Sequence, residues 1–414
     1  MAMDTPARIA ILGAGPIGLE AALYARFLGY DVDIYEQGEV AQNVRNWGHV
    51  EMFSPFEMNR SPLGLAALAA QDDAYQPPAD DALLTGREYA ERYLLPLSQT
   101  DLLADHLRLK TTVVAISRSD SRKTDLPSED RDVSPFLLLV RDDAGERHET
   151  ADIVIDTTGV YRHPNWLGQG GIPAIGERPL RDRIEYGVPD VAGAARPHYA
   201  NQHVLVVGSG YSAATTIVAL HALRKTAPDT QVTWATRQND PAPIPRFADD
   251  SLENRDRIAA RANELATAGT LLTGCQVTAI QPEADGRLGV SLTHPEVPAL
   301  TVDRIVANVG YRPDNSICEE LQVHQCYASG GPMKLAAALL ENTSANCLDQ
   351  TSRGAASLTN PEPHFYILGA KSYGRNSHFL IAVGLEQIRE LFALIGDREN
   401  LDLYATSRTL NVDP

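Results

Sequence analysis

The stretch that decides the fold is residues 8–36, which read RIAILGAGPIGLEAALYARFLGYDVDIYE. A short apolar strand leads into Gly13-x-Gly15-x-x-Gly18, which opens a helix of small and apolar residues, and a second strand ends at Glu36. The first glycine permits a tight turn, the second lets the backbone approach a pyrophosphate, and the third allows close packing of helix and strand. The stretch predicts a dinucleotide-binding unit in which Glu36 accepts hydrogen bonds from ribose hydroxyls.

A second stretch repeats this pattern. Residues 203–237 read HVLVVGSGYSAATTIVALHALRKTAPDTQVTWATR and contain Gly208-x-Gly210-x-x-Ala213, in which alanine still permits close packing. The second strand here ends at Arg237, where the first unit has an acid. A ribose 2′-phosphate is attracted by a guanidinium and repelled by a carboxylate. We therefore expect NADPH at this site with Arg237 as the 2′-phosphate ligand; the alternative is a surface arginine with NAD as cofactor.

The order of strands predicts that one domain is inserted in the other. At roughly 150 residues per domain, 414 residues favour two to three domains. Residues 301–309, after the second unit, resemble the buried strand at 151–159. We expect an α/β fold of two Rossmann-like, three-layer ββα dinucleotide-binding domains: residues 1–165 with 305–414, and 166–304 with its connecting segment.

Charge and cysteine content exclude several kinds of protein. The net charge is −18, which argues against an extended nucleic-acid or anionic membrane surface. The four cysteines, Cys275, Cys318, Cys326 and Cys347, form neither a Cys-x-x-Cys pair nor a zinc-ligand spacing. No apolar run approaches 18 residues. We expect a cytoplasmic protein without a metal, nucleic-acid or membrane partner; the sequence does not indicate its oligomeric state.

Local patterns predict further elements of the fold. Residues 85–103 have helical spacing, with Thr85 and Glu88 as a capping box. Residues 107–117 read as one strand, residues 119–134 as a loop, and residues 384–395 as a helix.

Two dinucleotide sites point to a bound flavin that accepts hydride and a nicotinamide that delivers it. The chain resembles the two-dinucleotide-binding-domain flavoproteins, such as flavin-containing monooxygenases and thioredoxin-reductase-like enzymes, over nearly its whole length. The resemblance implies FAD at Gly13, Gly15, Gly18 and Glu36, and NADPH at the second glycine motif.

The resemblance also assigns residues outside the glycine motifs. It implies that FAD meets the backbone of Val113, the turn Thr158-Gly159, Gly369 and Gly384, and the N–H groups of Leu385 and Glu386 near the flavin ring. The family often has Gly-Asp where this chain has Gly369 followed by Ala370 and Lys371. The ribityl contact of that aspartate must then come from elsewhere.

Two segments are candidates for the reaction site. Residues 43–60 resemble the monooxygenase loop that crosses the flavin, so Trp47 and His49 are expected near the ring; the alternatives are a packed core aromatic and a structural histidine. Residues 371–379, KSYGRNSHF, are rich in hydrogen-bond donors. We expect Arg375 or His378 to contact NADP or substrate, the alternative being a polar surface loop.

The absence of a Cys-x-x-Cys pair weighs against disulfide reduction, because that chemistry needs two thiols within bonding reach. We therefore expect an NADPH-reduced FAD monooxygenase that uses O₂ to oxygenate a small molecule, at nitrogen or sulfur, through a C4a-hydroperoxyflavin. The alternatives are an FAD-dependent NAD(P)H reductase or dehydrogenase without oxygen insertion, and a non-catalytic flavin-bound redox sensor or scaffold.

Overall fold

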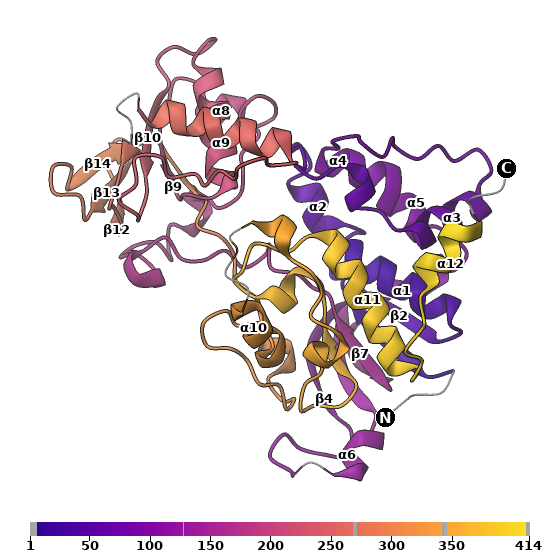
Figure 1. Ribbon diagram of the computed structural model, residues 1–414. Coiled ribbons are helices and arrows are strands. Elements are labelled where there is room, and N and C mark those ends of the chain that lie inside the picture. The colour runs from indigo at the N-terminus through magenta and orange to yellow at the C-terminus, as the bar shows by residue number, and fades with distance from the viewer. Residues whose placement is uncertain (1–5, 127, 268–270, 342–343, 345, 411–414) are drawn as a thin grey trace. The chain divides into compact units, whose positions relative to one another are not determined.

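The computed structural model describes residues 6–410, apart from 127, 268–270, 342–343 and 345. The chain forms two compact units, Met1–His163 with Arg312–Pro414, and Pro164–Tyr311. We call these the split unit and the continuous unit, because only the first is built from two separated pieces of chain. Figure 1 shows the helices and strands of each.

A parallel five-stranded sheet forms the centre of the split unit. Its order is β16 (Phe365–Ile367), β7 (Ile153–Asp156), β1 (Arg8–Leu12), β2 (Asp31–Tyr35) and β3 (Leu107–Arg108). Side chains alternate between two hydrophobic cores: Ile9 and Ile11 face one, Ala10 and Leu12 the other. This is the period-two alternation of a strand that is buried on both faces.

Helices cover one face of this sheet and a small sheet covers the other. The helices that share its core are α1 (Pro16–Phe27), α2 (Gln42–Asn46), α3 (Pro62–Gln71), α4 (Gly86–Tyr89), α5 (Leu95–Ser98), α11 (Ile381–Ile395) and α12 (Leu403–Leu410). Helix α10 (Met333–Leu340) packs in a separate cluster with Tyr373 and Val383, and a short α6 (Glu129–Val133) precedes β5. The small antiparallel sheet consists of β4 (Thr112–Arg118), β5 (Phe136–Asp142) and β6 (Gly145–Ala151). Its apolar side chains share a core with Ala10 and Leu12, which gives the expected three layers.

Two of the expected elements are interrupted. The capping box of Thr85 and Glu88 forms, but the helix that it starts changes to π-helical geometry at Ala90–Leu94 before α5. Pro96 follows this change and cannot donate an N–H to a regular helix. The single strand expected over residues 107–117 is two strands, β3 and β4, in different sheets, because the chain turns at Lys110 (φ 54°).

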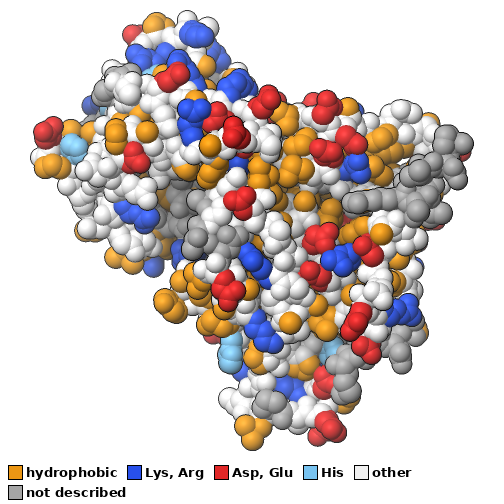
Figure 2. Space-filling view, viewed as in Figure 1, with side chains coloured by type: hydrophobic (Ala, Val, Ile, Leu, Met, Phe, Trp, Pro, Cys, Tyr) orange, Lys and Arg blue, Asp and Glu red, His pale blue; other side chains and the backbone are white. Residues whose placement is uncertain are grey.

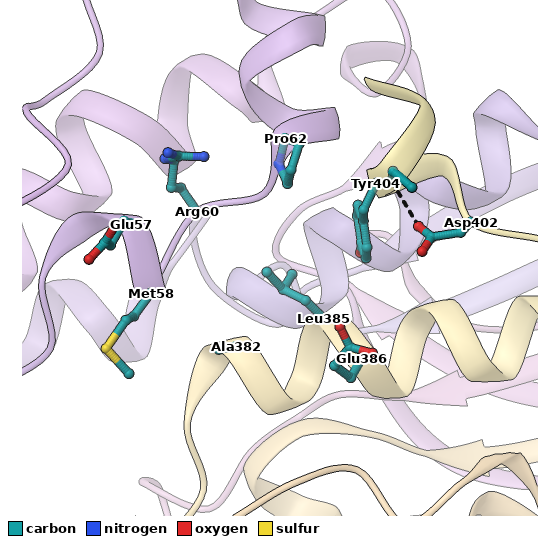
Figure 3. Close-up of a pocket in the computed structure, with 10 residues that line it drawn as sticks. Glu57, Met58, Arg60, Pro62, Ala382, Leu385, Glu386, Asp402 and Tyr404 are labelled. Atoms are coloured by element: carbon teal, nitrogen blue, oxygen red, sulfur yellow. Dashed lines mark hydrogen bonds between the residues drawn. The ribbon is translucent and has the colours of Figure 1, made fainter. Parts of the chain in front are cut away.

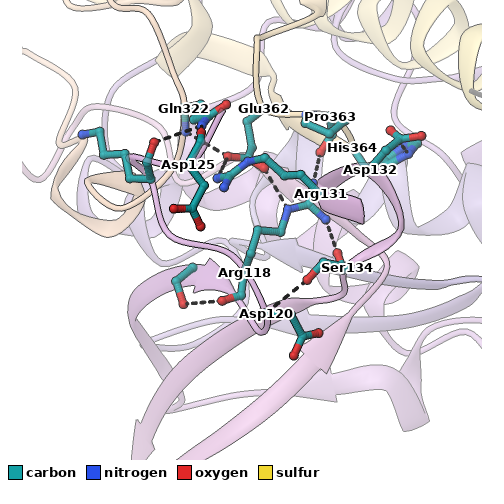
Figure 4. A network of polar contacts seen from close by, with 12 residues as sticks. Arg118, Asp120, Asp125, Arg131, Asp132, Ser134, Gln322, Glu362, Pro363 and His364 are labelled. Carbon is teal, nitrogen blue, oxygen red and sulfur yellow. Dashed lines mark hydrogen bonds and ion pairs between the residues drawn. The ribbon is translucent and has the colours of Figure 1, made fainter. Parts of the chain in front are cut away.

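The loop expected at residues 119–134 contains α6 and is anchored by a buried ion network (Figure 4). Glu362 lies between two arginines, with Arg118 Nε 2.8 Å and Arg131 Nη2 2.5 Å from its carboxylate oxygens. All three side chains are at most 2% exposed. The network joins β4 and α6 to the segment that precedes β16.

The continuous unit repeats the layered plan. Its parallel sheet has the order β11 (Leu271–Leu272), β10 (Gln231–Ala235), β9 (His203–Val207), β15 (Arg304–Ala307) and β8 (Ile184–Glu185). Helices α7 (Arg196–Tyr199), α8 (Tyr211–Leu223) and α9 (Glu253–Ala266) and the antiparallel strands β12 (Val277–Pro282), β13 (Leu288–Leu292) and β14 (Ala299–Val302) complete it. The predicted fold class, α/β with two Rossmann-like units, is confirmed.

Acidic and basic side chains are interspersed on the face shown in Figure 2, and acidic side chains gather over α11. None of the helices within the described residues combines the length and the apolar character that crossing a bilayer requires.

Candidate functional site

The first glycine motif forms a cradle at the start of α1. A Cβ atom on Gly18 would lie 1.9 Å from the carbonyl oxygen of Gly13, so helix and turn can approach this closely only with glycine. At Gly15 no described residue lies within 4 Å of where a Cβ atom would be, and Gly15 caps α1 without a side-chain hydrogen bond. The space beside Gly15, where α1 begins, is therefore open, and a helix start of this kind suits the pyrophosphate of a dinucleotide.

Glu36 lies at the end of β2 and is fixed by the backbone. Its two carboxylate oxygens accept the N–H groups of Ala14 at 3.0 Å and Gly38 at 2.8 Å. Each oxygen keeps a lone pair for a ribose hydroxyl. The N–H of Thr111 bonds to the Glu36 carbonyl at 2.9 Å, which brings the chain leading to Val113 across the end of β2. Val113 itself is half-buried in β4.

The turn after β7 meets the glycine loop. The hydroxyl of Thr157 donates to the carbonyl of Leu12 at 2.7 Å. Thr158 donates its N–H and its hydroxyl to the same carboxylate oxygen of Asp156, at 3.1 and 2.7 Å, and Gly159 has φ 71°. Thr158 and Gly159 were expected in this turn, whereas Thr157, whose hydroxyl ties the turn to the glycine loop, was not among the expected residues.

A buried ion pair lies behind this turn. Lys371 Nζ is 2.5 Å from Asp156 Oδ2 and 3.1 Å from the hydroxyl oxygen of Thr158. The two charged side chains are 1% and 0% exposed. This lysine, two residues after Gly369, therefore points inward and supports the turn, a role that the sequence alone did not reveal.

Ile17 of α1 lies against two further residues that were expected to contact the cofactor, Gly369 and Gly384. A Cβ atom on Gly384 would lie 2.3 Å from Ile17 Cδ1, and one on Gly369 would lie 3.2 Å from Ile17 Cγ1. Gly369 has φ 71°, and its N–H bonds to Gln387 Oε1 at 2.9 Å. The glycine loop, the 369 turn and the start of α11 thus meet at one point of the split unit.

The start of α11 differs from the expected one. The helix begins at Ile381 rather than at Gly384, and its N-cap, Leu380, makes no side-chain hydrogen bond. Unpaired N–H groups belong to the first turn of a helix, whereas those further in bond to carbonyls four residues back. Donors toward a flavin would therefore come from the turn that starts at Ile381, and not from the N–H groups of Leu385 and Glu386.

Trp47 and His49 follow α2. The Trp47 ring lies where a side chain at Gly86 would be, since a Cβ atom there would be 2.4 Å from the ring, and its edge faces Tyr161 at 6.4 Å between centroids. Trp47 Nε1 and His49 Nε2 are both buried without a hydrogen-bond partner among the described residues. Two orphaned ring nitrogens suit a site completed by a ligand.

Arg375 and His378 lie in the chain between Gly374 and α11. The N–H of Arg375 bonds to the Ser329 carbonyl at 2.8 Å, and that of His378 to Asn376 Oδ1 at 2.9 Å. The Arg375 side chain is exposed and that of His378 is half-buried. The segment is therefore fixed by its backbone, while the side chain of Arg375 extends outward.

The second glycine motif forms a similar cradle in the continuous unit. A Cβ atom on Gly208 (φ 134°) would lie 2.2 Å from the Asn308 carbonyl oxygen, and the position at Gly210 is open among the described residues. Ala213 is fully buried in α8. Arg237 is exposed and forms no ion pair within the described part of the chain, so its guanidinium is accessible from solvent.

The two glycine cradles are consistent with the protein family that the sequence matches. The model of the pyridine nucleotide-disulphide oxidoreductases matches residues 71–330, more than half of the chain. The chain belongs to the pyridine nucleotide-disulphide oxidoreductase family. FAD and a pyridine nucleotide are the cofactors of this family, and the two cradles offer one site for each. No curated protein matches the sequence.

Solved structures of both reductases and monooxygenases resemble this oxidoreductase. The bacillithiol disulfide reductase YpdA of Bacillus cereus has a TM-score of 0.66 at 18% identity, over 95% of this chain and 99% of that one. The cadaverine monooxygenase DfoA of Erwinia amylovora has 0.62 at 15%, over 96% of each chain. The ornithine N-hydroxylase KtzI of Kutzneria sp. 744 has 0.60 at 18%, over 95% and 100%. At such identities the likeness shows the shared fold.

The cysteines of this oxidoreductase are all free thiols. Burial raises the pKa of Cys318 to about 11 and also raises that of Cys275, which keeps both thiols protonated. The pKa of Cys326 is lowered by the N–H of Ser329. No cysteine occurs before residue 275 or after residue 347, so α1, the turn after β7 and the start of α11 carry no thiol.

Proposed function

We propose that the protein is an NADPH-reduced FAD monooxygenase that oxygenates a small molecule. The observation that carries the proposal is the place of the thiols. The three segments that meet at Ile17 contain no cysteine, whereas reduction of a disulfide by the chain's own thiols needs a reactive pair beside the flavin. Electrons therefore leave to an acceptor from outside the chain, and oxygen is the one proposed here.

Each cradle residue has a role in this proposal. The first turn of α1 would hold the FAD pyrophosphate, Glu36 the ribose, and the chain at Val113 the adenine. Lys371 and Thr158 position the turn at Gly159, and the first turn of α11 would stabilise negative charge on the ring. When bound, FAD supplies the two-electron chemistry between NADPH and the acceptor. Trp47, His49, Arg375 and His378 remain the candidates for the substrate side.

Rapid mixing tests the oxygen step without a known substrate. The FAD-loaded protein is reduced with NADPH without air and is then mixed with oxygenated buffer. For a monooxygenase we expect oxygen consumption to run ahead of the return of the oxidised-flavin absorbance, because the activated oxygen is protected from water. If oxygen loss, peroxide release and oxidised flavin coincide, the protein is a reductase without oxygen insertion; a protein that cannot bind FAD would be neither.

Replacing Arg237 with alanine is expected to raise the KM for NADPH about tenfold or more and to leave the KM for NADH nearly unchanged. Only NADPH carries the 2′-phosphate, and a charge-assisted hydrogen bond contributes about 1.5–3 kcal/mol. Steady-state NAD(P)H oxidation measures both constants. Arg224→Ala, an exposed arginine just after the C-terminal end of α8, is the control. Equal changes for both nucleotides in Arg237→Ala would refute the assignment.

A further inference from the structure

Helix α10 has an apolar stripe that faces away from the split unit. One side of the helix packs in the cluster that contains Tyr373 and Val383. On the other side Met333 and Leu340 are 42% and 73% exposed, and Ala337 between them is exposed as well. Because these three positions are three or four residues apart, they form a single stripe along the helix.

Two charged side chains border the stripe. Lys334 and Glu341 are exposed, and each follows one of the outer apolar residues by one position. Glu341 continues the helical backbone beyond α10 (φ −70°), so the two charges lie on the same flank, about two turns apart. Lys334 Nζ donates to the Thr359 hydroxyl at 2.6 Å and keeps two further donors. Glu341 forms no ion pair within the described residues.

The stripe and its charged flank are complementary to a second copy of themselves. When two identical helices pack antiparallel about a two-fold axis, side chains on one flank meet those on the same flank of the other copy, with the ends exchanged. An axis beside Ala337 would place Met333 against Leu340 of the second copy and Lys334 against its Glu341. Each of these contacts occurs twice, and the small side chain of Ala337 at the axis lets the two helices approach closely.

The pocket of the split unit does not account for this surface. The pocket has a volume of about 210 Å³ and is lined by residues of three segments, 57–62, 382–386 and 402–405 (Figure 3). Among the described residues that line it, none belongs to α10. A stripe along the outside of a helix provides no hollow for a small molecule, and it suits contact with another protein surface.

We propose that α10 is a self-association site at which two copies of this chain pair antiparallel through Met333, Ala337 and Leu340. A row of exposed apolar side chains marks an interaction surface, and the Lys334–Glu341 flank selects a second copy as the partner. Two helices of this length offer less contact than the roughly 1,200–2,000 Å² of a stable interface. We therefore expect a dissociation constant of about 1–100 µM. The proposal does not depend on the acceptor of the flavin electrons.

Sedimentation velocity of the FAD-loaded protein over a range of concentrations tests this inference. Wild type is expected to pass from monomer to dimer between about 1 and 200 µM. Lys334→Glu and Glu341→Lys each place like charges opposite each other at both ends of the helix pair, which should raise the dissociation constant at least about tenfold. The double variant exchanges the two charges and should restore the wild-type constant to within about threefold.

Further variants locate the contact on α10. Ala337→Glu would bring two carboxylates together at the axis and should leave only monomer; if this variant does not fold, the charge exchange still decides. Ile172→Glu and Lys225→Glu alter exposed apolar and cationic side chains of the continuous unit and are the matched controls. A wild type that stays monomeric, a dimer that persists in Ala337→Glu, or a double variant no better than the single ones would overturn the proposal.

Discussion

Replacing Lys371 with methionine is expected to lower the free energy of unfolding of the split unit by about 3–5 kcal/mol. The methionine leaves the carboxylate of Asp156, which is 0% exposed, without its cation, and among the described residues Thr158 is the hydrogen-bond donor that remains. The cost comes from that uncompensated charge, because an intact buried ion pair itself adds little stability. Hydrogen exchange of β7 and β16 peptides measures the loss within this unit, apart from the continuous unit.

Two further variants separate the ion pair from a general effect of losing a lysine. Lys110→Met removes an exposed pair with Glu39, whose side chains are 67% and 46% exposed, and should cost about 0–1 kcal/mol. The double variant Lys371→Met with Asp156→Asn should recover much of the loss, since no charge is left buried. If Lys371→Met costs no more than Lys110→Met, the pair does not support the turn as described. FAD affinity should fall in parallel, because Thr158 and Gly159 belong to that turn.

Replacing Glu362 with leucine is expected to lower the free energy of unfolding of the split unit by a comparable or larger amount, about 3–5 kcal/mol or more. Two guanidinium groups, Arg118 and Arg131, would then lie buried side by side without their shared carboxylate. The loop that contains α6 should separate from β16, which limited proteolysis at residues 119–134 would detect. Glu146→Leu, at an exposed pair with Arg141, is the control, and similar proteolysis of both variants would contradict the prediction.

The same carboxylate predicts a dependence of stability on pH. Burial opposes the ionisation of Glu362, but Arg131, the N–H of Gln322 and Arg118 together hold its pKa below the usual value. A group whose folded pKa is lowered stabilises the fold above its unfolded pKa, about 4.3 for glutamate, and this contribution is lost as the pH falls through the folded pKa. Acid unfolding of wild type should therefore include a proton uptake that Glu362→Leu lacks.

The glycine motifs made the architecture predictable, because the steric limits on the turn and the apolar pattern of the buried strands both depend on residues that are close together in the sequence. Features that depend on distant contacts were not predictable. The break at Lys110 follows from a change of sheet, and the inward turn of Lys371 depends on Asp156, 215 residues away. The buried Glu20 of α1 shows the same limit, since its helix position gives no hint of Tyr89, Tyr93 and Tyr404, which interact with it from other parts of the chain. The role of Arg237 remains a prediction from sequence.

The position of β16 also bears on how the protein emerges from the ribosome. Strand β7 pairs with β1 on one edge and with β16 on the other, yet residues 365–367 are made only after the whole continuous unit. A nascent chain would fold Pro164–Tyr311 as a complete body while β7 still presents an open edge, which is a template for unwanted pairing. Synthesis that pauses before β16 should therefore leave an aggregation-prone intermediate, and a holding chaperone would have its greatest benefit in that interval.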